Sequence, residues 1–229
     1  MKTIQLRDGK ERSLLRRHPW VFQGSIAKGG GDAGETVRVV SASGDFLAWA
    51  AYSPSSSIRV RAWSFDEAER IDSSCVSQFN VRASVFEDEE RLDEARAQYR
   101  RAVCLDVDQD SALRGLVRVS ENQEQRVEAL RLIQAELKRQ VTMGDGVLEF
   151  ASLAKAVLER DEVEACLREA AQERPDLWQT TLMLAEHLRQ NDQEDEAVAI
   201  SEATTQKFPL LPRVWMEHAL NLEAAGRRA

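Results

Sequence analysis

Cysteine and histidine, the side chains that most often serve as nucleophiles, metal ligands or proton carriers, are few in this sequence and far apart. The cysteines are 29 and 62 residues apart and form no CxxC pair, so their spacing indicates neither a zinc site nor a disulfide framework. The histidines have neither ligand nor triad spacing. We therefore expect no catalytic residue, no metal site and no cofactor. The residues concerned are Cys75, Cys104, Cys166, His18, His187 and His218.

Charge is distributed unevenly along the 229 residues. The net charge is −8, but residues 1–65 hold ten Lys or Arg and five Asp or Glu, whereas the remainder holds 21 basic and 34 acidic side chains. Seven of the eleven glycines also fall at or before Gly44. Such a change along a chain indicates two domains with different partners. We expect one domain at residues 1–72 and another at 73–229.

The first domain has the sequence pattern of β-strands. Residues 36–39 alternate apolar and polar side chains, 41–45 form a turn cluster, and apolar runs follow at 46–52 and 58–65. Upstream of these strands, residues 10–18 predict a short helix that ends before a proline. The pattern therefore favours a small α+β domain.

The string GKERSLLRRHPWVFQGSI, from Gly9 to Ile26, resembles the opening of a bacterial methyltransferase family that methylates cytosine in large-subunit ribosomal RNA. Short matches continue to about Asp72, which is about a third of the chain. The resemblance departs at Trp49 and Ala50, where the family usually has arginine and glycine. In that family the region is a PUA domain, a compact β-barrel-like module that binds RNA. The resemblance implies the same fold and partner for residues 1–72.

The resemblance ends before the catalytic part of that family, in which a linking domain and a Rossmann-like domain that uses S-adenosylmethionine follow the barrel. After Ser73 this sequence has no glycine-rich strand-to-helix turn, no Asp-Pro-Pro stretch and no cysteine in a matching context. We therefore expect that this chain is not an enzyme.

Cationic side chains of the first domain are candidates for contacts with structured ribosomal RNA. Phosphates attract exposed cations, and an aromatic ring can stack on an unpaired base. Residues 12 and 16 are four apart and would share a helix face, while residues 59 and 61 would share a strand face with 63. The candidate RNA contacts are Lys10, Arg12, Arg16, Arg17, His18, Arg59, Arg61 and Trp63. In the alternative interpretation these charges only solvate a small domain with a core of Leu14, Leu15, Trp20 and Phe22.

From Ser74 onward, apolar residues recur at helical spacing, and the pattern itself repeats. The dipeptide Glu-Ala occurs at 94–95, 128–129, 164–165 and 196–197, at intervals of 34, 36 and 32 residues. These intervals bracket the tetratricopeptide period of about 34, in which a small residue lies where the two helices of a hairpin cross. We therefore predict an all-α, tetratricopeptide-like solenoid. Its hairpins are expected at about 75–107, 110–141, 147–174 and 177–208, with one unpaired helix at 212–225.

The first helices of such hairpins line a concave groove that suits an extended peptide or a helix. Two arginines four residues apart, Arg114 and Arg118, are placed to receive an acidic segment. We find no lysine-and-asparagine clamp of the kind by which chaperone-binding members hold a terminal carboxylate. The alternative is a solvated face without a ligand. The candidate groove residues are Asn80, Ser84, Arg114, Arg118, Lys155, Glu186, Arg189 and Met216.

These patterns together predict a non-catalytic binding protein, in which a PUA-like, RNA-contacting module is joined to a tetratricopeptide array that binds a protein or peptide. Two alternatives are the regulatory or docking portion of a larger transferase whose catalytic domain is absent, and a purely structural array.

No apolar run approaches the roughly 18 residues of a membrane span, and the charged start MKTIQLRDGKERS lacks the apolar stretch of a secretory signal. We therefore expect a cytoplasmic protein with no membrane partner.

Overall fold

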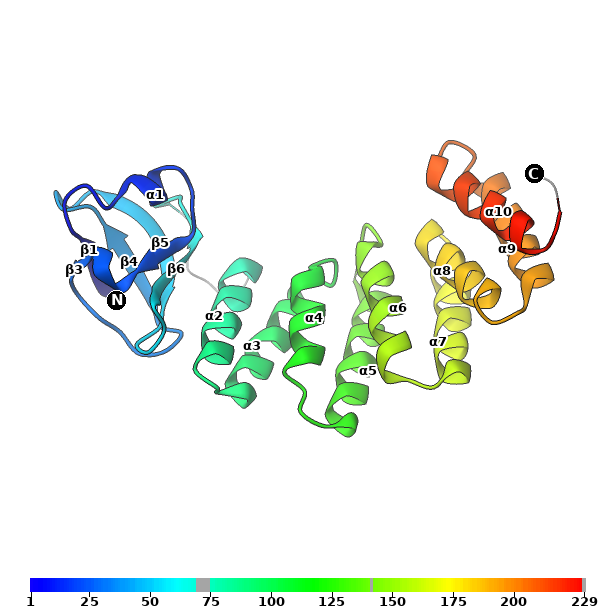
Figure 1. Ribbon diagram of the computed structural model, residues 1–229, viewed down its shortest axis with the longest axis horizontal. Coiled ribbons are helices and arrows are strands. Elements are labelled where there is room, and N and C mark those ends of the chain that lie inside the picture. The colour runs from blue at the N-terminus through cyan, green and yellow to red at the C-terminus, as the bar shows by residue number, and fades with distance from the viewer. Residues whose placement is uncertain (69–74, 141, 228–229) are drawn as a thin grey trace. The chain divides into compact units, whose positions relative to one another are not determined.

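The computed structural model describes residues 1–68, 75–140 and 142–227 (Figure 1). The chain divides into two compact units. The first consists of Met1–Leu105 with Arg118–Ser120, and the second of Asp106–Val117 with Glu121–Ala229. The first unit thus contains a sheet and the first helical hairpin. The domain boundary expected at 72/73 lies outside the described residues and stays a prediction.

The amino-terminal domain is a curled sheet of six strands in the order β2-β6-β5-β4-β1-β3 (Figure 1). β1 and β4 run parallel, and the other neighbouring strands are antiparallel. The strands predicted near 36–39, 46–52 and 58–65 are confirmed. The strands are β1 (Lys2–Leu6), β2 (Trp20–Phe22), β3 (Ile26–Lys28), β4 (Thr36–Val40), β5 (Phe46–Tyr52) and β6 (Ile58–Ser64), and the short 3-10 helix η1 (Gln23–Ser25) joins β2 to β3.

Aliphatic side chains fill the inside of this curled sheet. Ile4 of β1, Val39 of β4 and Val60 of β6 are fully buried, and Leu14 packs against them from the helix α1 (Arg12–Leu15). Alternation along each strand sends these side chains to one face. Burying such groups is the main favourable contribution to the stability of the domain.

The helix predicted over 10–18 is much shorter in the structure, because α1 comprises only Arg12–Leu15. The N–H groups of Arg17 and His18 donate back to carbonyls of this single turn, and Arg17 adopts a left-handed backbone with φ of 60°. This is the Schellman arrangement, which satisfies the last carbonyls of a helix and reverses the chain. Arg16 and Arg17 consequently follow the helix, and the prediction that Arg16 shares a helix face with Arg12 is wrong.

The sheet face opposite this core is covered over β5 and β6 by α2 (Val76–Asp88). Arg61 of β6 forms an ion pair with Asp88 at the end of α2. A Cβ atom at Gly34 would lie 2.7 Å from the ring of Phe86, so a larger residue there would force α2 away. Trp49 is only 6% exposed, although the resembled family usually has a charged arginine there. The first helix of the array is therefore packed on the sheet within one compact unit.

The remaining helices form successive antiparallel hairpins (Figure 1). They lie where the repeat pattern predicts them, to within a few residues at each end, and the tetratricopeptide-like solenoid is confirmed. The helices are α2, α3 (Leu92–Leu105), α4 (Asp110–Arg118), α5 (Gln123–Arg139), α6 (Asp145–Val157), α7 (Arg160–Glu173), α8 (Trp178–Arg189), α9 (Glu194–Lys207) and α10 (Pro212–Ala224).

The recurring alanines lie at the hairpin crossings in all but one case. Ala95 and Ala197 are fully buried, each as the fourth residue of its helix, and Ala129 is 3% exposed. Ala165 is exposed, so the prediction is wrong in the third hairpin. There the fourth residue of α7 is Val163, which is 1% exposed. In the third hairpin, Val163 rather than Ala165 therefore occupies the buried position.

A carboxylate holds the turn that leads into the third hairpin. Asp108 accepts hydrogen bonds from the N–H groups of Met143 at 2.6 Å and Gly146 at 2.9 Å, at the start of α6. Burial raises the pKa of the Asp108 carboxyl, but these bonds and one from Thr142 outweigh burial and hold the pKa below its ordinary value. A negative charge at a helix N-terminus also interacts favourably with the helix dipole. The charged form of Asp108 is therefore favoured by folding.

Ala95→Leu should destabilise the protein by about 1–3 kcal/mol, because three additional heavy atoms would enter a closely packed helix crossing. The matched control is Ala165→Leu, which lies on an exposed face and should change stability by about 0.5 kcal/mol or less. Urea denaturation followed by circular dichroism would measure both. Equal midpoints for Ala95→Leu and the unaltered protein would refute the crossing geometry.

Asp108→Asn should destabilise the second unit by about 1–3 kcal/mol at pH 7, because two backbone N–H groups lose a charged acceptor. Since folding lowers the pKa of Asp108, its contribution is present above the unfolded pKa of about 3.9 and is lost as the pH falls through the lower folded value. The stability difference between the two proteins should therefore shrink below about pH 4.

Urea denaturation at several pH values would check this expectation. The control is Asp145→Asn, which removes an exposed carboxylate from the same end of α6. A loss of stability that stays constant down to pH 3, or one that Asp145→Asn reproduces, would contradict the role given to Asp108.

Candidate functional site

Two large aromatic side chains are exposed on β2, an edge strand that pairs with β6. Trp20 is 45% exposed and Phe22 is 51% exposed, whereas Val21 between them is buried. The alternation of a strand explains the arrangement, because Val21 occupies the core face and its two neighbours occupy the other. Exposed aromatic rings side by side on one strand are unusual on a protein surface that binds nothing.

These positions overturn the alternative core expected from the sequence. Leu14 is buried, at 2% exposed, but Leu15 is 67% exposed and is on the surface together with Trp20 and Phe22. Hydrophobicity alone does not show that the sheet interior is already filled by the aliphatic residues of β1, β4 and β6.

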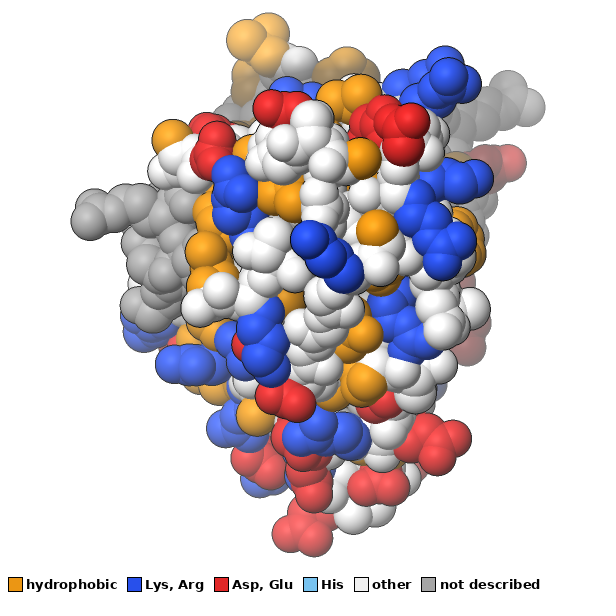
Figure 2. Space-filling model, turned by 90° about the vertical axis from the view of Figure 1, so that its left-hand side faces the viewer, with side chains coloured by type: hydrophobic (Ala, Val, Ile, Leu, Met, Phe, Trp, Pro, Cys, Tyr) orange, Lys and Arg blue, Asp and Glu red, His pale blue; other side chains and the backbone are white. Residues whose placement is uncertain are grey.

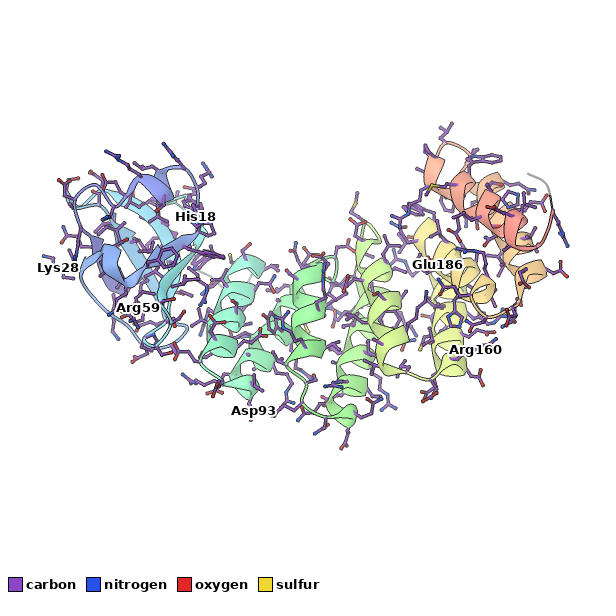
Figure 3. The ribbon with its side chains drawn as sticks, in the orientation of Figure 1. His18, Lys28, Arg59, Asp93, Arg160 and Glu186 are labelled. Carbon is purple, nitrogen blue, oxygen red and sulfur yellow. The ribbon has the colours of Figure 1, made fainter. Side chains whose placement is uncertain are left out.

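Cationic and aromatic groups adjoin the exposed rings. The ring of His18 meets that of Trp20 edge-on, with centroids 5.5 Å apart, and the backbone N–H of Trp20 donates to Nδ1 of His18. The guanidinium of Arg17 lies over the Phe65 ring, 5.7 Å from its centroid. Arg16 and Arg17 are both exposed. We call the surface formed by Arg16, Arg17, His18, Trp20 and Phe22 the β2 edge surface; His18 is labelled in Figure 3.

The other predicted RNA contacts do not all join this surface. Lys10 and Arg12 are exposed in the turn and helix that precede it. Arg59 and Arg61 are only 9% and 8% exposed. The sequence placed them correctly on the sheet face opposite Val60, but that face is covered, so they do not extend an exposed patch.

The arginines of β6 are held by groups of their own unit. Arg59 donates through Nη1 to the carbonyl of Ser53 at 3.2 Å, and Arg61 pairs with Asp88. Trp63 is partly buried. On the face shown in Figure 2, Lys and Arg side chains are spread among hydrophobic ones rather than gathered in a single patch. The candidate interface therefore keeps the exposed Arg16, Arg17 and His18 with the aromatic rings of β2, but not the arginines of β6.

Trp20 and Phe22 are the residues that sequence reasoning missed as surface candidates. The available signal was the alternation of a three-residue strand, Trp-Val-Phe, in which only one side chain can point inward. A strand this short has too few positions for alternation to stand out in the sequence.

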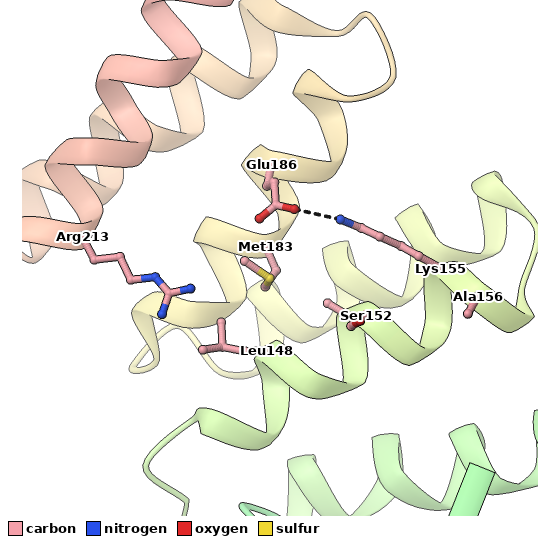
Figure 4. Close-up of a pocket in the computed structure, with 8 residues that line it drawn as sticks. Leu148, Ser152, Lys155, Ala156, Met183, Glu186 and Arg213 are labelled. Carbon is pink, nitrogen blue, oxygen red and sulfur yellow. Dashed lines mark hydrogen bonds and ion pairs between the residues drawn. The ribbon is translucent and has the colours of Figure 1, made fainter. Parts of the chain in front are cut away.

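In the second unit, two of the predicted groove residues line a common cavity of about 500 Å³ (Figure 4). Lys155 of α6 donates to Glu186 of α8 at 3.0 Å. Arg213 of α10 reaches the same cavity and lies 5.6 Å from the ring centroid of Trp178. The first helices of three successive hairpin positions therefore contribute to one hollow, as the solenoid register predicts. Its other lining residues are Leu148, Ala151, Ser152, Ala156 and Met183.

The remaining groove arginines are paired with carboxylates. Arg114 forms ion pairs with Asp110 and with Glu149, the latter at 3.3 Å. Arg189 donates to Glu217 at 2.8 Å and to the side-chain oxygen of Asn221 at 2.8 Å. An acidic peptide would have to displace these internal partners.

Within the first unit, Arg118 makes a two-pronged contact with Glu87, at 2.6 and 2.7 Å, so its charge is also matched. Asn80 and Ser84 of α2 are half-buried in the same unit. Met216 of α10 is 59% exposed. Of the predicted groove residues, only Lys155 and Glu186 line the cavity shown in Figure 4.

Within residues 1–68, 75–140 and 142–227, no group of three or more His, Cys, Asp or Glu is arranged to hold a metal ion. Within the same ranges, Cys75, Cys104 and Cys166 take part in no disulfide bond. The helices described in these ranges are all too short or too polar to cross a membrane.

Comparison with known proteins assigns the curled sheet to a class. The PUA-like domain family matches residues 4–65, and the amino-terminal domain is a PUA-like domain. It is homologous to the amino-terminal region of ribosomal RNA large subunit methyltransferase I. The enzyme of Citrobacter koseri is 56% identical over 71 residues, covering 30% of this chain and 18% of the relative. That of Klebsiella pneumoniae is 55% identical over 73 residues, covering 31% and 18%.

The chain thus spans about a fifth of the length of the curated relatives it matches, and the similarity is confined to its first third.

The helical part is similar to solved tetratricopeptide structures. YrrB, described as a TPR protein with an unusual peptide-binding site, has a TM-score of 0.38 and 18% identity, covering 66% of this chain and 78% of that one. A thermophilic TPR protein of Thermus thermophilus also has a TM-score of 0.38 and 18% identity, covering 64% and 81%.

Proposed function

We propose that the amino-terminal domain binds single-stranded segments of structured RNA, and that the chain acts as a non-catalytic binding protein. The observation that carries this proposal is the exposure of Trp20 and Phe22 on an open sheet edge, with His18 against Trp20 and the exposed Arg16 and Arg17 shortly before them in the chain. Flat aromatic rings stack on bases that are not paired, and arginines attract the phosphates that join those bases. The match to a PUA-like domain adds support, because the named relatives act on ribosomal RNA.

A different occupant of the β2 edge surface would be another protein domain. In the relatives, most of the chain lies beyond the region matched here, so the alternative is that this face docks on the catalytic portion of a transferase. The two proposals differ in their salt dependence. RNA contact loses affinity steeply as salt rises, because each neutralised phosphate releases counterions, whereas docking through Trp20 and Phe22 is mainly apolar and depends little on salt.

Trp20→Ala combined with Phe22→Ala should weaken binding to a ribosomal RNA hairpin with an unpaired loop by about 5- to 150-fold for each base stack that is lost. Fluorescence anisotropy of the full chain across a salt series would measure this. Arg16→Ala combined with Arg17→Ala should flatten the salt dependence of log K by up to about two units.

The matched control is Trp215→Ala, which removes a tryptophan that is 50% exposed on α10 and should leave RNA affinity unchanged. The circular dichroism of each variant should match that of the unaltered protein, since the replaced side chains are exposed. Unchanged affinity in the Trp20 and Phe22 double variant, with an unchanged slope in the arginine variant, would favour the docking alternative.

The second unit supports a second binding function. We infer that the cavity lined by α6, α8 and α10 accepts an extended peptide with an acidic residue, since Arg213 enters it with no carboxylate of the described residues at ion-pair distance. Met183 and Leu148 supply apolar surface beside this charge. Such a combination of apolar lining and a few placed polar groups is typical of ligand sites.

Arg213→Glu should abolish the enrichment of acidic sequences when a random peptide library is selected on the full chain, because the variant repels the anionic residue. Arg131→Glu makes the same charge change on the exposed surface of α5 and should leave the selection unchanged. If the unaltered protein enriches no common sequence, or if both variants alter the selection equally, this cavity is not the peptide site.

A further inference from the structure

The amino-terminal domain has a polar hollow, and two of its lining residues, Lys28 and Arg59, lie away from His18 (Figure 3). Its volume is about 420 Å³. Three cations line it: Arg7 after β1, Lys28 at the end of β3 and Arg59 on β6. The remaining lining residues are Gln23, Ile26, Ala27, Gly29, Tyr52 and Pro54. No acidic residue is among them.

The three cations also lack ion pairs within the part of the chain that the structure describes. Among the described residues, no carboxylate lies within ion-pair distance of Arg7, Lys28 or Arg59. Most other arginines of the array and of the sheet have such a partner, as Arg61 does. Like charges gathered around one hollow repel one another unless an anion comes between them.

Backbone contacts orient two of the three cations. Arg7 donates through Nε to the carbonyl of Ile26 at 3.1 Å, and Arg59 donates through Nη1 to the carbonyl of Ser53 at 3.2 Å. These bonds use one N–H group of each guanidinium and leave further donors for a ligand. Lys28 is exposed at the rim. The guanidinium groups of Arg7 and Arg59 are therefore held in place by backbone carbonyls, whereas the exposed Lys28 side chain can adjust to a ligand.

Burying Arg59 costs free energy, because a charged residue that is only 9% exposed has lost most of its hydration. Arg59 interacts electrostatically with Glu89, whose pKa is held below its ordinary value: burial raises this pKa, but hydrogen bonds from Ser53 and Ser55 and the charge of Arg59 outweigh burial. Glu89 is engaged by those serines and does not line the pocket. Its charge offsets that of Arg59 only from a distance.

The wall of the pocket beside Lys28 requires glycine. Gly29 has φ of +105°, and a Cβ atom there would lie 2.3 Å from the carbonyl oxygen of Thr3. Any other residue would push the chain away from β1 and move Lys28 with it. The position of Lys28 at the rim thus depends on a backbone conformation that glycine alone adopts without strain.

We propose that this pocket binds a phosphate group, held by the guanidinium groups of Arg7 and Arg59 and by the ammonium of Lys28, with the Tyr52 hydroxyl and the Gln23 amide as further donors. Phosphate oxygens accept several charge-assisted hydrogen bonds at once, and guanidinium groups match their geometry. The proposed RNA contact suggests the source of that phosphate, either an internal phosphodiester or a terminal monoester of the strand. The existence of the pocket does not depend on that proposal.

The test is titration of the full chain with inorganic phosphate at constant pH and constant ionic strength, followed by NMR of the arginine side-chain N–H groups. The Nε–H signals of Arg7 and Arg59 should shift and saturate, with a dissociation constant on the order of 1 mM. Lys28→Ala should weaken binding by at least about threefold. The control Lys2→Ala removes a lysine that is already paired with Glu35 and Asp32 and should leave the titration unchanged.

Absence of a saturable shift with phosphate in the millimolar range would overturn the proposal, and so would equally tight binding of acetate, which would make the pocket a carboxylate site. Two single-stranded RNA oligonucleotides, one with a 5′-phosphate and one with a 5′-hydroxyl, then identify the source. Competition by both supports an internal phosphodiester, and competition by the phosphorylated strand alone supports a terminal monoester. Phosphate binding without competition from either strand supports the pocket and overturns RNA as the source of its phosphate, while RNA binding at the β2 edge surface is decided separately by the Trp20 and Phe22 variant.

Discussion

The packing of α2 on the face of β5 and β6 is the contact on which the organisation of the first unit depends. A curled sheet has an inner face, filled here by aliphatic side chains, and an outer face that must be either polar or covered. In this chain β5 is buried on both faces, and α2 supplies the second cover. The Arg61–Asp88 pair and the close approach of Gly34 to Phe86 fix the position of that helix. Because α2 is also the first helix of the array, the sheet of the PUA-like domain packs directly against the first hairpin within the first unit.

This contact also explains where sequence reasoning succeeded and where it failed. The hairpins follow from helical periodicity and a repeat near 34 residues, both of which are local properties of the chain. The burial of Arg59 and Arg61 is not a local property of the chain. Alternation shows which sheet face they occupy, but not that a helix some 20 residues later covers that face. Ala165 and Val163 illustrate the same limit: the dipeptide repeats in the third hairpin, but the buried side chain there is Val163, two residues before Ala165.

Pairing of charges separates the two candidate surfaces of the protein. Along the groove helices, Arg114, Arg118 and Arg189 face carboxylates within their own units, so their charges contribute to rigidity and add little attraction for a ligand. On the sheet, Arg7, Lys28 and Arg59 have no such partners among the described residues. In a chain with a net charge of −8, three cations without a carboxylate partner among the described residues thus lie around one hollow of the domain that is positive overall. Charge counts taken from the sequence cannot reveal this difference, because they do not show which cations are already neutralised.

The exposed rings of β2 and the phosphate pocket are contiguous in the sequence, which favours their serving one ligand. Phe22 ends the exposed strand, and the next residue, Gln23, lines the pocket. On the paired strand, Ile58 lies opposite Phe22, and the next residue, Arg59, reaches the pocket. A nucleic acid strand likewise alternates flat bases with charged phosphates. In a duplex the bases are already stacked on one another and are inaccessible to side-chain rings, so a surface of this kind favours an unpaired segment.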